Sequence, residues 1–354
     1  MDWPWHGVFN RPMNRSLRAL LPIGVLAFLL GLASCNRKSN LWHDPSNHKV
    51  EFVTVDNGVQ LEVLDWGGSG RAIVLLAGSG NTAHVFDDFA PKLSGTYHVY
   101  GITRRGFGAS TRAESGYTDQ RLADDIFQVL HSLRIVNPVL LGHSMAGAEL
   151  TTLGSQHSDE LSGLVFLDAL LDHGAHDAEY AAIRKKLPAA MLGGPEPSDA
   201  DRKSFQAYRE WQKRTSNTVF PVSELRNCYQ ANPDGSMGDY KTADSIFDAM
   251  DAGVRKRDYS RIRVPVLAFV TFPASAGNLM GGSYTPKNEQ ERAAMDESFK
   301  AVVGYIKQDE KKLQTEVPGA RVIEMPGADH HVFLSNESDV LRELGKFLED
   351  LPRR

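Results

Sequence analysis

Short, continuously apolar runs alternate with amphipathic segments through most of the chain, and this alternation limits the fold more than any other feature. Ala72–Ala77 (AIVLLA) and Leu164–Leu167 (LVFL) have the continuity expected of strands buried on both faces. Two β-rich runs meet at Asn57-Gly58, a dipeptide typical of hairpin turns because both residues tolerate positive φ. The other predicted strands are His48–Val55, Val59–Trp66, His98–Thr103, Val139–Leu141, Val266–Phe272 and Arg321–Glu324.

Helical patterns lie between these strands. In Asp119–Leu133 the apolar residues recur every three or four positions, which predicts an amphipathic helix. The alternation predicts an α/β fold, a mostly parallel sheet with helices on both faces. The stretch of about 172–260 interrupts the pattern without a convincing strand, so we expect a mostly helical cap inserted into a single domain, 48–354. The other predicted helices are Met145–Gln156, Glu289–Leu313 and Asp339–Leu351.

The N-terminal residues have the features of a targeting segment. Three arginines precede Ala19–Ser34, a run of sixteen uncharged residues that is short for a membrane span and typical of a signal-peptide core. Leu32-Ala33-Ser34-Cys35 resembles a bacterial lipobox, in which the chain is cut before a cysteine that then receives lipid. We therefore expect a signal peptide over 1–34, lipidation at Cys35, a polar tether over 35–47 and attachment to the membrane of the bacterial cell envelope.

Two alternatives to lipidation remain open: an ordinary signal peptide, which would give a secreted or periplasmic protein, and an uncleaved anchor. Met13 also serves as an alternative start to Met1. The only other cysteine, Cys228, lies in the expected cap and has no predicted role, so no disulfide framework is expected. A net charge of −5 argues against a nucleic-acid partner.

One motif carries the chemistry. Gly142-His143-Ser144-Met145-Ala146-Gly147 is close to G-x-S-x-G and lies between a predicted strand and a predicted helix. In such a tight turn the residues two before and two after the serine must be small, and Ala146 departs from glycine by a single methyl group. The turn lifts the Ser144 hydroxyl out of the sheet and leaves the Met145 N–H at a helix start, where it can stabilise an oxyanion. Ser144 is thus the predicted nucleophile.

With this motif the sequence resembles the α/β-hydrolase superfamily over nearly all of 50–350. Leu75–Gly80 is similar to the family's oxyanion loop, although Ala77-Gly78 replaces the usual His-Gly. Arg104–Ser110 is similar to its R-G-x-G-x-S loop, and Pro326–His330 to the loop that carries the catalytic base. The resemblance implies an oxyanion hole made of the Met145 and Ser79 backbone N–H groups.

The same resemblance implies that His330 takes the serine proton, since an imidazole titrates near neutral pH. Its neighbour His331 is the alternative base. The family usually places the triad acid after the penultimate strand, but the loop that follows Val266–Phe272 holds no carboxylate. Asp168, at the end of the preceding strand, is the predicted acid because some lipases of the superfamily use that position. A distal carboxylate such as Glu289, or no functional acid, are the alternatives.

Other polar residues have simpler interpretations. Arg104 and Arg105 are expected to brace loops by hydrogen bonds, and Asp124 and Asp125 to lie on a helix surface. His173 and His176 are interpreted as surface histidines at the cap entrance. The consecutive run Asp329-His330-His331 lacks the spacing of helical metal ligands, and no nucleotide-binding motif occurs, so neither metal nor cofactor is predicted.

These features predict a serine hydrolase, carboxylesterase- or lipase-like, that cleaves a carboxylic ester or related acyl bond of a small molecule through an acyl-enzyme. A serine nucleophile argues against the related dehalogenases and epoxide hydrolases, which need a carboxylate there. The alternatives are a C–C bond hydrolase, a cofactor-free peroxidase on the same scaffold, and a catalytically dead lipoprotein that binds a small ligand. The apolar residues expected to line an acyl pocket or only to pack the cap are Leu187, Met191, Phe205, Tyr208, Trp211 and Phe220.

Overall fold

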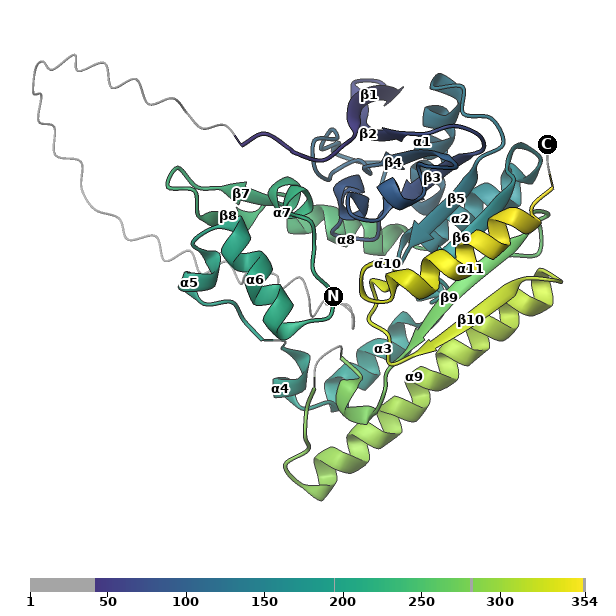
Figure 1. Ribbon diagram of the computed structural model, residues 1–354. Coiled ribbons are helices and arrows are strands. Elements are labelled where there is room, and N and C mark those ends of the chain that lie inside the picture. Colours follow the sequence, from purple (N-terminus) through teal and green to yellow (C-terminus); the bar gives the residue numbers. More distant parts are fainter. Residues whose placement is uncertain (1–41, 194, 281–282, 353–354) are drawn as a thin grey trace, which may run out of the picture.

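The protein is built around one eight-stranded sheet with the strand order β1-β2-β4-β3-β5-β6-β9-β10 (Figure 1). The computed structural model describes residues 42–193, 195–280 and 283–352. β2 pairs antiparallel with β1 and β4, and the other neighbouring strands are parallel. This confirms the predicted α/β-hydrolase fold. The strands are β1 (Lys49–Asp56), β2 (Val59–Gly67), β3 (Ala72–Leu76), β4 (His98–Ile102), β5 (Val139–His143), β6 (Gly163–Leu167), β9 (Val266–Phe272) and β10 (Arg321–Pro326).

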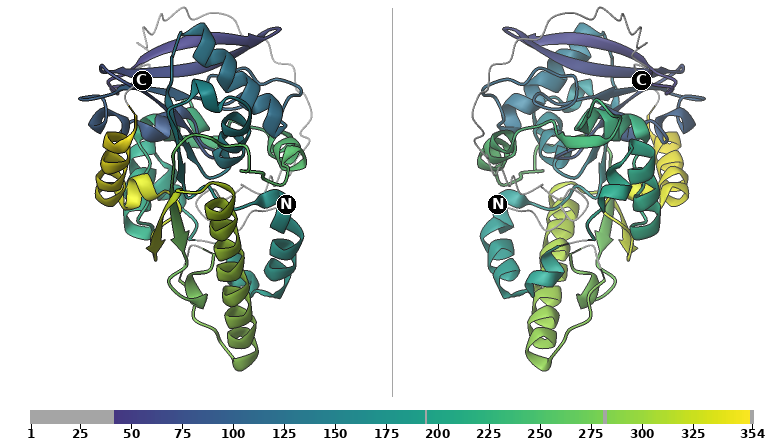
Figure 2. Two further views of the ribbon diagram at one scale, coloured as in Figure 1. Left: turned by 90° about the vertical axis from the view of Figure 1, so that its right-hand side faces the viewer. Right: turned by 90° about the vertical axis from the view of Figure 1, so that its left-hand side faces the viewer.

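Each central strand buries both of its faces, because successive side chains point to opposite sides of the sheet. In β3, Val74 and Leu76 pack in a cluster with α1 (Asp119–Ser132), α2 (Ala146–Gln156) and α9 (Glu289–Glu316). Ile73 and Leu75 of the same strand face the opposite cluster, which contains η2 (Ala83–Phe86), η3 (Ala90–Lys92) and α11 (Glu337–Asp350). Figure 2 shows β9 and β10 lying between α9 and α11. Helices therefore cover both faces, as the continuous apolar strands predict.

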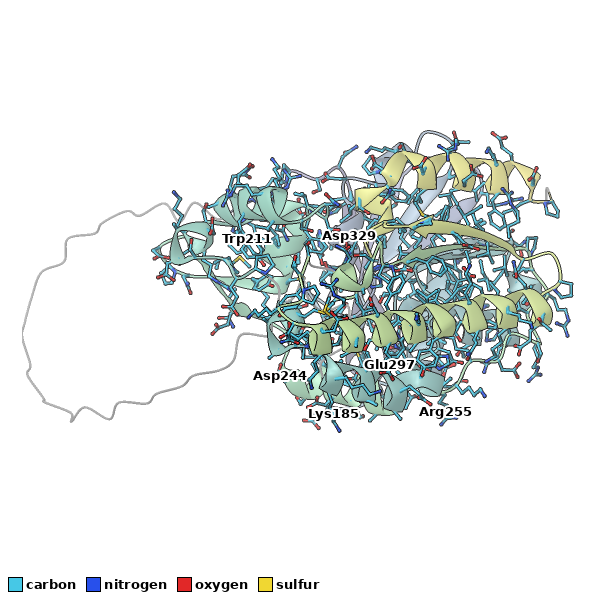
Figure 3. All side chains as sticks on the ribbon, turned by 90° about the horizontal axis from the view of Figure 1, so that it is seen from below. Lys185, Trp211, Asp244, Arg255, Glu297 and Asp329 are labelled. Atoms are coloured by element: carbon cyan, nitrogen blue, oxygen red, sulfur yellow. The ribbon has the colours of Figure 1, made fainter. Side chains whose placement is uncertain are left out.

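The segment between β6 and β9 forms the insertion. Figure 3, seen from below, shows that α6, marked by Trp211, lies beyond the end of the sheet at which Asp329 is found. The expectation that this segment holds no strand is wrong: β7 and β8 form an antiparallel pair. The elements of the insertion are α3 (His173–Lys186), α4 (Ala189–Leu192), α5 (Asp199–Arg202), α6 (Phe205–Thr215), α7 (Val222–Cys228), β7 (Tyr229–Ala231), β8 (Met237–Tyr240) and α8 (Asp244–Gly253).

The hairpin was missed because it is short and polar. The sequence between its strands, Asn232-Pro-Asp-Gly-Ser236, is a turn signal, but three- and four-residue strands carry too few side chains to show alternation. The hairpin is held by a buried Tyr229 and Met237, which pack against α6 and α7 in the second core cluster. Packing against the helices thus decides the strand conformation here.

The predicted signal peptide, the lipidation site Cys35 and both candidate starts lie outside the described residues. From residue 42 onward the chain contacts the domain: the Arg226 guanidinium lies 4.8 Å from the centre of the Trp42 ring, and His48 is buried against Asp87. No helix in the described part of the chain is long and apolar enough to cross a membrane.

Candidate active site

Ser144 lies in the sharp turn between β5 and α2, with φ of 55°. A non-glycine residue in this left-handed region is strained, and such strain is typical of a nucleophile turn. The structure also explains the shifted glycine of the motif. A Cβ on Gly147 would lie 2.0 Å from the Ala169 carbonyl oxygen, whereas Ala146 is fully buried without such a conflict. The close approach of two chain segments, rather than the turn alone, requires glycine at 147.

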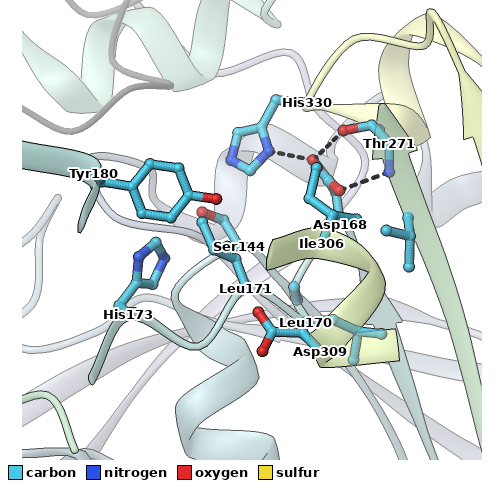
Figure 4. A pocket seen from close by; sticks show the side chains of 12 residues that line it. Ser144, Asp168, Leu170, Leu171, His173, Tyr180, Thr271, Ile306, Asp309 and His330 are labelled. Atoms are coloured by element: carbon cyan, nitrogen blue, oxygen red, sulfur yellow. Dashed lines mark hydrogen bonds and ion pairs between the residues drawn. The ribbon is translucent and has the colours of Figure 1, made fainter. Parts of the chain in front are cut away.

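Asp168 follows β6 and His330 follows β10, the two strands that flank β9 in the sheet. The His330 Nδ1 atom lies 2.6 Å from Asp168 Oδ2 (Figure 4). Asp168 is itself held by Thr271, whose backbone N–H donates to Oδ1 at 2.9 Å and whose hydroxyl donates to Oδ2 at 2.7 Å. The carboxylate therefore has a fixed orientation toward the imidazole, from a strand end that the sequence marks only by an apolar run followed by Asp.

The rival candidates lie elsewhere. His331 is buried and turns its Nε2 to the Asn81 amide oxygen at 3.1 Å; burial and the neighbouring His330 hold its pKa well below the ordinary value. Glu289 begins α9 with 89% of its side chain exposed and contacts Arg292. Neither group touches Asp168. His143, buried beside the turn, has its Nε2 3.1 Å from the backbone oxygen of His330 and so supports the loop that carries this histidine.

The loop after β3 packs directly against the serine turn. A Cβ on Gly78 would lie 3.0 Å from the Ser144 Cβ, so the backbone of this loop reaches the nucleophile only because residue 78 is glycine. The next backbone N–H belongs to Ser79. Within the described residues, neither this N–H nor that of Met145, the first residue before α2, donates a hydrogen bond to the protein. Both donors are thus available to a ligand.

Ser144, Asp168 and His330 line the same small cavity, which is partly open to solvent. Its walls come from the loop after β6, from α3, β9 and α9 (Figure 4). The lining residues are Ser144, Asp168, Ala169, Leu170, Leu171, His173, Tyr180, Val270, Thr271, Ile306, Asp309 and His330.

Sequence reasoning missed the polar groups of this cavity. Tyr180 and Asp309 line it, and burial raises the pKa of each above its ordinary value. The interpretation of His173 and His176 as surface histidines is wrong: His173 lines the cavity, and His176 places its Nε2 3.2 Å from Asp309 Oδ1. Both histidines belong to the inner face of α3, whose weak apolar periodicity gave no signal.

The six apolar cap residues that were candidates for an acyl pocket do not line this cavity. Met191 and Leu187 pack in the cluster beside α9, and the other four pack around α6 and α7. Their role in the described structure is therefore packing of the cap, which was the alternative interpretation.

Buried ion pairs brace the loops around the site. Arg104 contacts both carboxylate oxygens of Glu149 at 2.6 and 2.8 Å and donates to the backbone oxygens of Ala77 and Gly78. Arg105 makes a matching pair with Asp125 at 2.6 and 2.7 Å. The expectation of loop bracing by both arginines agrees with these contacts. The expectation that Asp125 lies on the surface is wrong, because this face of α1 is turned inward; Asp124 is half-buried.

The insertion also holds the loop after β3, which the sequence did not indicate. From α7, the buried Glu224 accepts hydrogen bonds from the Asn81 amide at 2.8 Å and the Thr82 backbone N–H at 3.1 Å. Burial raises the pKa of Glu224 above its ordinary value. Cys228, one turn further, has its thiol 3.2 Å from Glu224 Oε1 and 3.4 Å from the Gly80 backbone oxygen, and burial keeps its pKa well above the ordinary value. Cys228 is therefore an inert, packed thiol in contact with the loop.

A mostly parallel sheet, a serine in the strand-to-helix turn of β5 and a His–Asp pair at two other strand ends define a hydrolase of the α/β-hydrolase class. The chain belongs to the alpha/beta hydrolase family, whose sequence model matches residues 73–344.

Comparison with individual proteins agrees with this assignment. The chain is 23% identical over 287 residues to 2-(acetamidomethylene)succinate hydrolase of Mesorhizobium japonicum, covering 80% of this chain and 89% of that protein. It is 31% identical over 123 residues to a non-heme chloroperoxidase of Kitasatospora aureofaciens, covering 34% of this chain and 44% of that protein. A crystal structure of E-2-(acetamidomethylene)succinate hydrolase superposes with a TM-score of 0.60 at 20% identity, covering 85% and 99% of the two chains. The fold is thus shared with enzymes of several activities.

Proposed function

We propose that the protein is a serine hydrolase that cleaves a carboxylic ester or related acyl bond of a small molecule. The observation that carries the proposal is the 2.6 Å contact between His330 Nδ1 and an Asp168 carboxylate that Thr271 holds in place, in the same cavity as Ser144. An acid that accepts the Nδ1 proton leaves Nε2 as the basic nitrogen, which is the form a serine nucleophile needs.

The chemical steps follow from these positions. His330 Nε2 takes the proton from the Ser144 hydroxyl as the oxygen attacks the carbonyl carbon, and Asp168 stabilises the imidazolium that forms. The carbonyl oxygen becomes an oxyanion, which the Ser79 and Met145 N–H groups stabilise. His330 then returns the proton to the leaving oxygen, and water releases the acyl group from Ser144 by the same steps.

The cavity walls favour a neutral, compact acyl group. Leu170, Leu171, Val270 and Ile306 supply apolar surface, and Asp309 places a carboxyl group at the same wall. A negatively charged acyl chain would meet this group and the Asp168 carboxylate at short range, in surroundings that screen charge poorly. We therefore infer short, uncharged acyl groups as the preferred class.

The test is hydrolysis of p-nitrophenyl esters of increasing acyl length, together with covalent labelling by a fluorophosphonate. Ser144→Ala should abolish both, while Ser94→Ala, at a serine whose hydroxyl donates to the Pro91 backbone oxygen near the surface, should leave both unchanged. Full labelling of Ser144→Ala would overturn the nucleophile assignment. Activity only on diketones, or only with peracids, would replace acyl hydrolysis by C–C hydrolysis or peroxidation, and a folded protein with no labelling would support a binding role.

The place of action is proposed from the sequence: a lipoprotein of the bacterial cell envelope, with lipid on Cys35 and with neither a nucleic-acid nor a cofactor partner. Metabolic labelling with an alkyne fatty acid should mark the wild-type chain and fail to mark Cys35→Ser. A labelled Cys35→Ser chain, or an unlabelled wild type, would contradict lipidation at this residue.

A further inference from the structure

A compact group of histidines and carboxylates lies where the N-terminal segment meets the domain, apart from the residues that line the Ser144 cavity. Asp44 and His48 come from the segment before β1, and His84 from η2. Each offers one ligand atom, and the three atoms lie within 4.8 Å of one another. The His48 and His84 side chains are 3% and 4% exposed, and that of Asp44 is 22% exposed. The group is thus enclosed, with an opening at Asp44.

The second polar atom of each of these side chains is already engaged. Asp44 Oδ1 accepts the Ser46 backbone N–H at 2.9 Å, which leaves Oδ2 toward the histidines. His48 Nδ1 lies 2.8 Å from Asp87 Oδ1, which leaves Nε2. His84 Nε2 lies 3.4 Å from Glu62 Oε1, which turns Nδ1 toward the carboxylates of Asp44 and Asp87. A carboxylate on the far nitrogen of a ligating histidine is the usual arrangement around protein-bound metal ions, because it fixes the tautomer and the ring.

The separations also suit an ion. Asp44 Oδ2 is 3.4 Å from His84 Nδ1 and 3.9 Å from His48 Nε2. Ligands about 2.0–2.1 Å from a tetrahedral zinc ion are about 3.4 Å from each other. Asp87 Oδ2, which also accepts the Ser223 hydroxyl at 2.5 Å, lies 3.2 Å from His84 Nδ1 on the same side of the group. Hydrogen bonding alone fits less well, since the one N–H of His84 Nδ1 faces two carboxylate oxygens, at 3.2 and 3.4 Å, whereas N–H···O hydrogen bonds are usually about 2.7–3.2 Å long.

We propose that Asp44, His48 and His84 bind a divalent transition-metal ion, zinc by the chemistry of the ligands, with Asp87 beside the fourth position. Two imidazoles and a carboxylate match the preference of Zn²⁺ for nitrogen and oxygen donors. Asp44, Glu62 and Asp87 bring three carboxylates to a largely enclosed volume, where their charge must be offset by protons on the facing histidines or by a bound cation.

The site would fasten the N-terminal segment to the catalytic domain. His84 lies a few residues after Ser79 in the chain. Glu62 also accepts a hydrogen bond from the Thr103 hydroxyl at 2.8 Å, and the oxygen of that hydroxyl accepts the Ala83 backbone N–H. Because the ion would join residues 44 and 48 to η2, its removal should loosen this attachment and lower the thermal stability. This role is structural and does not depend on the proposed hydrolase activity.

The experiment uses the full chain in detergent, expressed without a polyhistidine tag. Elemental analysis of the purified protein, and titration of chelator-treated protein with Zn²⁺ against a chromophoric competitor, should give one bound ion per chain and a rise in Tm on zinc addition. Asp44→Asn and His48→Gln should each weaken binding about tenfold or more and remove the rise in Tm. His98→Gln is the matched control, since His98 contacts Asp65 at 2.8 Å and belongs to no such three-residue group within the described part of the chain.

Two results would overturn the proposal: wild-type protein that neither retains nor binds zinc in stoichiometric amount, or variants at Asp44 and His48 that bind as tightly as His98→Gln. Cobalt titration of the wild type gives a measurement that does not depend on variant folding. A four-coordinate nitrogen–oxygen site should produce strong visible absorption, whereas a purely hydrogen-bonded cluster should produce only the weak spectrum of hydrated Co²⁺.

Discussion

Replacing Asp168 by asparagine tests the core of the proposed mechanism. Three donors converge on this carboxylate: the Thr271 N–H on Oδ1, and the Thr271 hydroxyl and His330 Nδ1 on Oδ2. The backbone N–H cannot turn away, so the oxygen of asparagine must stay at Oδ1 and its amide group must take the Oδ2 position. The Thr271 hydroxyl can rotate and accept from this group, but His330 can accept only by moving its own proton to Nε2.

The expected cost follows from that tautomer. With a proton on Nε2, His330 cannot accept the Ser144 proton, and the loss in kcat is about 10⁴-fold when a triad carboxylate becomes an amide. At about 1.36 kcal/mol for each factor of ten, this is roughly 5 kcal/mol of transition-state stabilisation. The volume and most hydrogen bonds are kept, so Tm should change little.

The assay is kcat and kcat/KM for a short-chain p-nitrophenyl ester, with the rate of fluorophosphonate labelling as a second readout. Glu289→Gln, at the exposed rival acid, is the matched control and should behave as wild type. Asp168→Asn with an unchanged Tm and with activity within a factor of ten of wild type would refute the assignment of the acid.

The remaining predictions concern the loop after β3 and the insertion. Glu224→Ala should lower the free energy of unfolding by about 1–3 kcal/mol in denaturant titration, because it leaves buried donors unpaired. Glu224→Gln should be nearly neutral. Equal losses in the two variants would contradict the hydrogen-bonding role. Gly78→Ala should reduce kcat about 100-fold by displacing the Ser144 side chain. An unchanged kcat would mean that the loop moves to make room for the added methyl group. Burial, with the charges of Asp251 and Asp172, raises the pKa of Asp177 to about 6. Because the pKa is raised in the folded protein, stability that is present at low pH is lost as the pH rises through about 6. Asp177→Asn should therefore raise Tm at pH 8 and not at pH 4. A gain in Tm at both pH values would rule out titration as the cause.

Local features of the sequence were enough for most of the fold. The continuous apolar runs predicted the strands, because a strand covered on both faces has no exposed positions to fill with polar residues. The nucleophile turn was also recognisable from the sequence. Its tight backbone leaves room only for small residues within a few positions of Ser144, so the requirement is local. The β7–β8 hairpin, the burial of Asp125 on α1 and the inward histidines of α3 were not predicted, because a short hairpin and a buried polar side chain leave no periodic signal.

What the sequence determined by itself is therefore the class of fold and the order of its chemical groups: a serine after one strand, an aspartate after the next and a histidine after the last. Tertiary structure decided which of these groups meet. Asp168 and His330 are 162 positions apart in the chain, and their 2.6 Å contact depends on β6, β9 and β10 being neighbours. The same holds for Glu224 against the loop after β3, and for Asp44 and His48 against His84. A contact between distant segments depends on the relative placement of whole elements, and that placement is fixed by core packing rather than by any short pattern of residues.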